Sequence, residues 1–92
     1  MGQKRIECKI TGRVQMVMFR DFAQRKARSL RLVGTVQNLK DGSVAVVTEG
    51  EEEVLKKFVV LLHKGSIFAK VEEVETEWLS ATGEFCDFCI IF

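Results

Sequence analysis

The residues best suited to chemistry lie in one stretch, Gly12 to Arg20, which reads Gly-Arg-Val-Gln-Met-Val-Met-Phe-Arg. It joins an alternating apolar run to a helical pattern, so it predicts a turn from a strand into a helix. Such a turn points several backbone N–H groups at one spot, and the helix start adds partial positive charge. Arg20, in the first helical turn, adds a full positive charge and a two-pronged hydrogen-bond donor. The stretch therefore predicts an anion-binding loop suited to phosphate.

The composition argues that any anion is bound locally and not by the overall charge. The 92 residues carry 14 basic and 13 acidic side chains, for a net charge of +1. That balance disfavours bulk binding of nucleic acid or of acidic membranes. The length predicts a single domain over residues 1–92.

The start of the chain shows no pattern of a secretory signal, because residues 1–5 are not followed by an apolar segment. The longest apolar stretch, residues 58–62, is too short to span a bilayer. We therefore expect a cytoplasmic protein with no membrane partner.

The cysteines do not indicate a metal or redox site. Their number, three, is odd, which argues against a disulfide framework. Cys86 and Cys89 form a C-x-x-C pair inside a predicted strand, where an odd separation places them on opposite faces. We expect half-buried thiols that pack as small hydrophobic groups, with no metal and no cofactor.

The first half of the chain predicts a strand, a helix and a hairpin. Ile6, Cys8 and Ile10 alternate with polar residues, which indicates a strand ending at Gly12. Apolar residues at helical spacing follow from Phe19 and stop near Leu32. Residues 33–38 and 43–48 read as two strands around an Asp-Gly turn, a strong hairpin signal.

The second half adds a helix and two strands. Acidic residues 51–53 open an apolar helical stripe, and Gly65 is a candidate for its end. Residues 70–79 read as a strand with a bulge or lead-in near Val71. Residues 85–92 read as a final strand, apolar on both faces, which suggests burial or contact with another chain. The order is βαββαβ with a final strand after it, and βαββαβ predicts an α+β ferredoxin-like sandwich, an antiparallel sheet with two helices on one face.

Two separated motifs resemble those of the acylphosphatase family. The residues that match the first motif are Gly12, Val14, Gln15, Val17, Phe19 and Arg20. The residues that match the second motif are Gly34, Val36, Asn38, Gly42, Val44 and Gly50. Residues 69–74 also look like the family's fourth strand. The resemblance covers nearly the whole chain and implies the ferredoxin-like fold.

The resemblance implies a metal-independent hydrolase that cleaves acyl phosphates to a carboxylate and phosphate. It implies that the phosphoryl oxygens are held by backbone N–H groups of Val14, Gln15, Met16, Val17, Met18, Phe19 and Arg20. The resemblance also implies that the guanidinium of Arg20 binds the same group and that the side chain of Asn38 orients the attacking water. A small acyl phosphate or inorganic phosphate is the expected partner. His63, near a helix end, is expected to be a surface residue and not a catalyst.

Two positions depart from the family pattern, since Met16 replaces a glycine and Thr35 replaces an aromatic residue. Where φ is positive, a methionine costs about 1–2 kcal/mol or rearranges the loop. Where φ is negative, its side chain points away. The alternative to the enzyme is therefore a non-catalytic module of the same fold that binds phosphate or a protein. An RNA-binding domain is disfavoured, because the predicted hairpin lacks aromatic residues for stacking.

Overall fold

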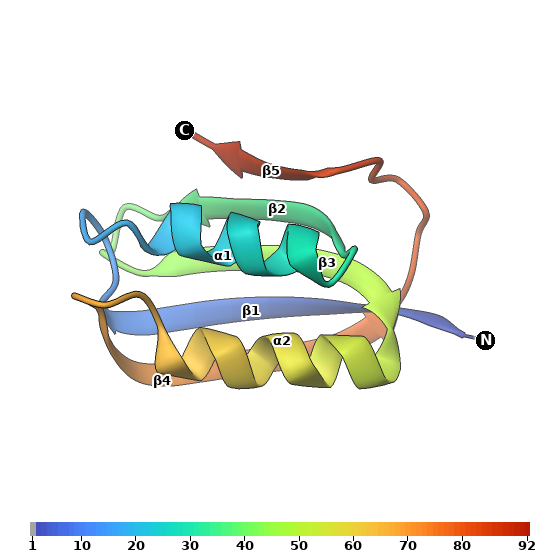
Figure 1. Ribbon diagram of the computed structural model, residues 1–92, viewed down its shortest axis with the longest axis horizontal. Helices are drawn as coiled ribbons and strands as arrows, with labels where there is room; N and C mark the ends of the chain where they lie inside the picture. Colours follow the sequence, from blue (N-terminus) through green and yellow to red (C-terminus); the bar gives the residue numbers. More distant parts are fainter. Residues whose placement is uncertain (1) are drawn as a thin grey trace.

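The computed structural model describes residues 2–92, which leaves only position 1 outside the described part of the chain. The elements, in chain order, are β1 (Gln3–Arg13), α1 (Phe19–Ser29), β2 (Val33–Asn38), β3 (Val44–Glu51), α2 (Glu52–Lys64), β4 (Lys70–Ser80) and β5 (Phe88–Ile91). Figure 1 shows the two helices lying over one face of a five-stranded sheet.

The sheet has the strand order β4-β1-β3-β2-β5. β1 pairs antiparallel with both β3 and β4, and β2 pairs antiparallel with β3. This arrangement confirms the predicted ferredoxin-like sandwich. The four strands of the βαββαβ unit pair antiparallel as predicted, whereas the final strand, β5, pairs parallel with β2. The segment after β4 crosses one end of the sheet, so β5 begins beside the start of β2 and runs in the same direction (Figure 1).

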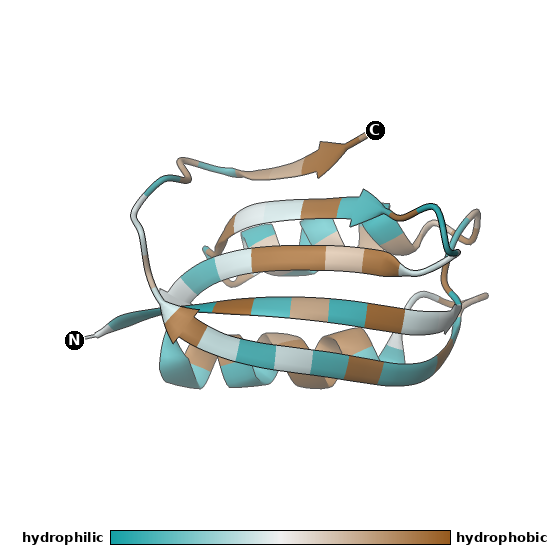
Figure 2. Ribbon diagram, turned by 180° about the vertical axis from the view of Figure 1, so that it is seen from behind, coloured by the Kyte–Doolittle hydropathy of each residue, from teal (hydrophilic) through white to brown (hydrophobic). Residues whose placement is uncertain are grey.

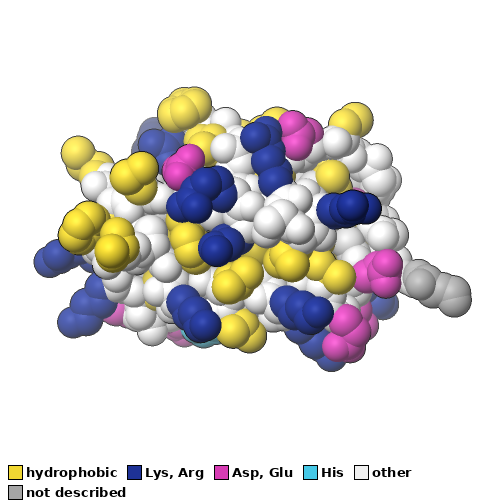
Figure 3. Space-filling model, viewed as in Figure 1, with side chains coloured by type: hydrophobic (Ala, Val, Ile, Leu, Met, Phe, Trp, Pro, Cys, Tyr) yellow, Lys and Arg dark blue, Asp and Glu magenta, His cyan; other side chains and the backbone are white. Residues whose placement is uncertain are grey.

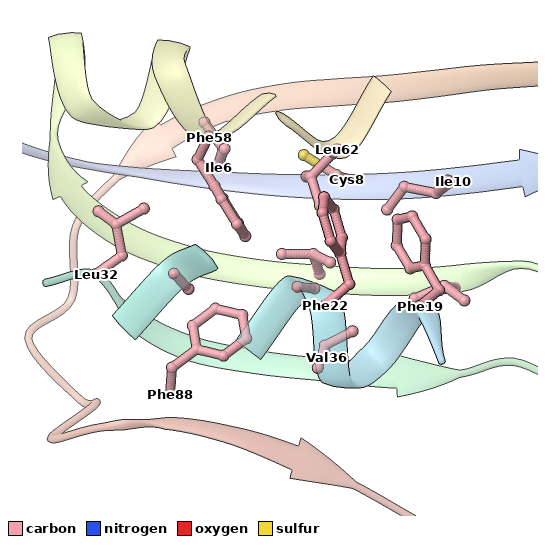
Figure 4. Packing of buried hydrophobic residues seen from close by; sticks show 14 of the residues in the cluster. Ile6, Cys8, Ile10, Phe19, Phe22, Leu32, Val36, Phe58, Leu62 and Phe88 are labelled. Carbon is pink, nitrogen blue, oxygen red and sulfur yellow. The ribbon is translucent and has the colours of Figure 1, made fainter. Parts of the chain in front are cut away.

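The core lies between the sheet and the helices. Ile6, Cys8 and Ile10 of β1 are buried on the helix side, as their alternation predicts. Figure 4 shows Phe19 and Phe22 of α1 entering the same layer as side chains of α2 and of β5. The helical residues buried there are Phe19, Phe22, Ala23, Ala27, Leu55, Phe58 and Leu62. Figure 2, seen from behind, shows hydrophobic and hydrophilic residues alternating along β1 and β4, the pattern of strands with one covered face.

β1 continues through Gly12 to Arg13 and does not end at Gly12 as predicted. Its register with β4 shifts between Thr11 and Gly12, so that Glu72 is an extra residue on β4. This is the predicted irregularity near Val71. Gly12 has a φ of 120°, and a Cβ there would collide with the carbonyl oxygen of Lys70. The close approach of β4 thus explains a glycine inside the strand.

The final strand is shorter than predicted, since it begins only at Phe88. Cys86 therefore precedes the strand, and Cys86 and Cys89 are both exposed. The expectation that these thiols pack half-buried is wrong. Phe88 alone in β5 is buried, because it faces the helices while Cys89 faces the uncovered side. Within residues 2–92 no three His, Cys, Asp or Glu side chains are grouped to hold a metal ion.

Glu49 fastens the segment that leads from β4 to β5. Its carboxylate accepts hydrogen bonds from the backbone N–H groups of Thr82 and Gly83, each at 3.0 Å. Arg5 donates to it as well, at 3.0 Å. Burial opposes ionisation of this carboxyl group, but these donors outweigh it and lower the pKa of Glu49 to about 2.

Neither helix of the described residues has the length and apolar character needed to cross a bilayer.

Candidate active site

The loop between β1 and α1, residues 14–18, has a backbone shaped for an anion. Met16 and Met18 have positive φ values of 60° and 61°, while Val17 between them does not. Alternation of this kind turns successive N–H groups toward one side and forms an anion-binding concavity. Within residues 2–92, no backbone N–H group of residues 14–20 donates a hydrogen bond to another residue. The loop therefore presents a row of donors without protein acceptors.

The start of α1 adds to this row. Met18 is the N-cap residue, and its side chain makes no capping hydrogen bond. A Ser, Thr, Asp or Asn at this position would satisfy one of the first N–H groups of the helix itself. Without such a cap, those groups and the positive end of the helix dipole remain for a ligand.

Two side-chain contacts hold the loop in place. Gln15 donates through Nε2 to the carbonyl oxygens of Leu39, at 2.7 Å, and Ser43, at 2.8 Å. These bonds fasten the loop to the turn that joins β2 to β3. On the other side, the hydroxyl of Ser66, after α2, donates to the carbonyl oxygen of Val17 at 2.7 Å. The loop is therefore braced from two directions.

Arg20 and Asn38 line one surface pocket of about 250 Å³. The other residues that line it are Val14, Met16, Met18, Phe19, Asp21, Ile90 and Phe92. The pocket brings the start of α1 together with the end of β2. The two side chains that the sequence predicts as site residues, Arg20 and Asn38, thus lie in the same pocket.

Arg20 has no carboxylate partner within residues 2–92. The neighbouring carboxylate of Asp21 contacts Arg25, at 2.9 Å, and not Arg20. The guanidinium of Arg20 lies instead over the ring of Phe92, 4.9 Å from its centroid. A cation held against an aromatic face keeps its N–H groups for an additional acceptor.

Asn38 is the last residue of β2 and faces the helix side of the sheet, opposite Val44 of β3. Its Oδ1 atom is buried and has no hydrogen-bond partner within residues 2–92. Buried polar atoms of this kind are rare, because each one costs free energy. Rotation about the Cβ–Cγ bond, which has a broad torsional preference, turns either amide atom toward the pocket.

Most of the predicted site residues come together in this pocket, but not all in the predicted way. Gln15 was expected to contribute only its backbone N–H group to phosphate binding. The structure shows that its side chain also holds the loop to the hairpin through two hydrogen bonds. Val17 faces a neighbouring pocket on the other side of Met18. His63 is exposed in the last turn of α2, as expected. The sequence analysis missed Ser66, Ile90 and Phe92, for which no local pattern gives a signal.

The structure shows a positive φ at Met16, the more costly of the two cases. Its side chain nevertheless points into solvent and is 99% exposed. The methionine therefore strains the loop without filling the pocket.

A ferredoxin-like domain with an anion-binding loop at its first strand–helix turn is the class of protein that this geometry defines. Comparison with known proteins agrees. The family model for acylphosphatases matches residues 6–90. An acylphosphatase of Caldanaerobacter subterraneus subsp. tengcongensis is 42% identical over 88 residues, 96% of this chain and 98% of that protein. One of Thermus thermophilus is 46% identical over 79 residues, 86% of this chain and 90% of that protein.

The structural comparison points the same way. The crystal structure of acylphosphatase from Bacillus subtilis superimposes with a TM-score of 0.94 at 34% identity, covering 97% of this chain and 99% of that one. The chain belongs to the acylphosphatase family.

Proposed function

We propose that the pocket of Arg20 and Asn38 is where this chain hydrolyses acyl phosphates, the reaction of its family. The observation that carries the proposal is the convergence of three features on one pocket. These are the row of N–H groups in residues 14–20, an arginine without a carboxylate partner and an amide with an unsatisfied oxygen. Each is a group that phosphoryl transfer needs, and together they leave room for a phosphoryl group.

The loop and Arg20 hold the phosphoryl oxygens. Phosphoryl transfer depends on positioning and on stabilising negative charge, and backbone N–H groups supply both without titrating. Arg20 stays charged at any physiological pH and matches the geometry of phosphate with two parallel donors.

Asn38 orients the attacking water. The Oδ1 atom, which lacks a partner, accepts a hydrogen bond from the water once the amide turns toward the pocket. The oxygen of that water then attacks phosphorus. The bond from phosphorus to the acyl oxygen breaks, its electron pair leaves with the carboxylate, and a phosphoryl oxygen takes the proton of the water.

This reaction does not require a strong general base, because a carboxylate is a good leaving group. Positioning and charge stabilisation by Arg20, Asn38 and the loop are therefore the contributions that we assign to the protein. The cytoplasmic location inferred from the sequence stays a prediction.

Hydrolysis of acetyl phosphate in the presence of EDTA tests the proposal. We expect Arg20→Gln and Asn38→Ala each to lower kcat at least about a hundredfold, the effect of losing one well-placed donor at a developing charge. Arg28→Gln is the matched control, since Arg28 lies at the far end of α1 and pairs with Asp87. Circular dichroism checks that each variant folds. A folded variant with full activity would remove the role assigned to that residue.

The non-catalytic module remains the second outcome of this experiment. It is favoured if the wild type binds inorganic phosphate but turns over no acetyl phosphate. The positive φ of Met16 is the observation behind it, because a loop strained there is the feature most able to misplace the donors. Met16→Gly would then show whether the methionine silences the site.

A further inference from the structure

Large apolar side chains surround the candidate site without being covered by protein. The exposed ones at this end of the molecule are Met16, Met18, Ile67, Phe68 and Phe92. Ile67 is 90% exposed and Phe68 is 72% exposed. In Figure 3 hydrophobic side chains gather at the end where Figure 1 places the loop before α1 and the loop after α2. Contiguous apolar patches of this kind mark sites that bind apolar ligands.

A second pocket, of about 190 Å³, lies beside the first. It is lined by Val17, Met18, Phe22, Arg25, Gly65, Ser66, Ile67 and Phe68. Met18 lines both pockets, so its flexible side chain borders the two of them. An apolar surface thus runs from the phosphate-binding loop over Met18 to Ile67 and Phe68.

The second pocket is preformed. The hydroxyl of Ser66 is bonded to the carbonyl oxygen of Val17, which ties this wall directly to the phosphate-binding loop. The backbone N–H of Ala69 donates to the carbonyl oxygen of Ser66 at 3.0 Å, closing the turn that presents Ile67 and Phe68. The two exposed side chains therefore lie on a hydrogen-bonded turn that is joined to the loop before Arg20.

We infer that the acyl part of the substrate is an aliphatic chain that leaves the phosphoryl group, passes over Met18 and lies in the second pocket. The inference rests on the proposed function, because the loop of residues 14–20 fixes where the phosphoryl group begins. An acetyl group is too short to leave the first pocket and would use none of this surface. Met18, with its unbranched thioether, adapts to chains of different length. The substrate class is therefore acyl phosphates of medium-chain fatty acids.

The test compares acetyl phosphate with octanoyl phosphate, held below its micelle-forming concentration. Both release an alkyl carboxylate of similar basicity, so the chemical step is matched. Each methylene that is fully buried raises kcat/KM by at most about fourfold, and we expect octanoyl phosphate to be preferred by about tenfold or more. The double variant Ile67→Ser, Phe68→Ser should lower kcat/KM for octanoyl phosphate about fivefold or more and leave that for acetyl phosphate unchanged. Neither residue touches the first pocket.

Val60→Ser is the control variant, because Val60 is an exposed apolar residue on α2 that lines neither pocket. It should leave the preference for octanoyl phosphate as in the wild type. Equal kcat/KM for both substrates in the wild type, or a preference that survives in the double variant, would overturn the inference.

Binding of octyl phosphate and methyl phosphate, measured by calorimetry, separates this inference from the proposed function. Tighter binding of octyl phosphate that is lost in the double variant upholds the apolar subsite, even if acetyl phosphate is not hydrolysed. Equal binding of the two ligands overturns it. If the double variant instead loses binding to phosphatidylcholine vesicles while the two ligands bind equally, the apolar surface serves a membrane and the inference is wrong.

Discussion

At Met16 a non-glycine residue occupies the left-handed region, with a φ of 60°, in the middle of the loop between β1 and α1. Such a backbone costs a residue with a Cβ about 1–2 kcal/mol relative to glycine. No packing offsets that cost, because the side chain is almost wholly in solvent. The strain is instead maintained by the two contacts that brace the loop, from Gln15 and from Ser66.

We therefore expect Met16→Gly to raise the free energy of unfolding by about 1 kcal/mol, the relief of strain less the added freedom of glycine in the unfolded chain. Urea unfolding followed by Trp78 fluorescence measures the change. Ile67→Gly is the control, since Ile67 is also exposed but its φ is not in the left-handed region, and it should lose stability. A loss of stability in Met16→Gly would show that the loop is not strained there.

At the scale of elements, the site depends on how the loop before α1 is joined to the hairpin of β2 and β3. Arg20 belongs to α1 and Asn38 to β2. Their relative position therefore depends on the contacts that hold these two elements together. Packing in the core joins α1 to β2 directly, and the side chain of Gln15 adds a second connection through two hydrogen bonds from the loop to the hairpin turn. We therefore expect Gln15 to be a positioning residue, which would act on the proposed reaction through the geometry of Arg20 and Asn38.

Gln15→Ala removes both donors and leaves the carbonyl oxygens of Leu39 and Ser43 without them. We expect a loss of about 2 kcal/mol in stability, from two neutral hydrogen bonds. We also expect kcat/KM for acetyl phosphate to fall at least about tenfold, because small displacements of positioned groups are costly in rate. Urea unfolding and steady-state kinetics measure the two effects. Gln37→Ala, at an exposed position on β2, is the comparison, and equal behaviour of the two variants would contradict the role of Gln15.

At the scale of the whole molecule, the chain must cross from one edge of the sheet to the other to place β5. β4 and β5 are the two edge strands, and the segment between them follows one end of the sheet (Figure 1). Glu49 holds that segment through Thr82 and Gly83, and Arg5 completes the cluster. β5 leads to Phe92, whose ring lies against the guanidinium of Arg20. Glu49 therefore anchors the segment of chain that places β5 and Phe92 beside the candidate site.

The anchor makes stability depend on pH. The pKa of Glu49 is about 2 in the folded protein, below its ordinary value of 4.5, so its contribution is fully present above about pH 4.5. As the pH falls from there toward 2, protonation removes that contribution. Glu49→Gln should lower the free energy of unfolding by about 2 kcal/mol at pH 7, from hydrogen bonds to a charged group. The difference from the wild type should be smaller at pH 3.

Urea unfolding at the two pH values measures this dependence. Glu77→Gln is the control, because Glu77 is exposed on β4 and outside the cluster; it should change stability by less than about 0.5 kcal/mol at either pH. A difference between Glu49→Gln and the wild type that stays constant from pH 7 to pH 3 would contradict the assigned anchor.

The local pattern of the chain was enough to predict most of its architecture. Alternation along β1, helical spacing from Phe19 and the Asp-Gly turn each depend on residues close together in sequence, and the structure confirms these elements. Arg20 and Asn38 were predicted as site residues through their places in the two motifs that resemble the family, and not from the turns beside them. The family followed from those motifs and is confirmed by the comparisons.

Contacts between distant segments required the tertiary structure. The parallel pairing of β5, the exposure of Cys86 and the arrival of Phe92 at Arg20 depend on where the segment after β4 crosses the sheet. The clamp from Gln15 spans 24 residues to Leu39, and that from Ser66 spans 49 residues to Val17. No periodicity records such pairs. The sequence alone therefore determined the elements and predicts which groups bind phosphate, since both rest on residues close together in the chain. Only the tertiary structure decided the sign of φ at Met16 and which residues surround Arg20. Both depend on contacts with residues that are distant in the sequence.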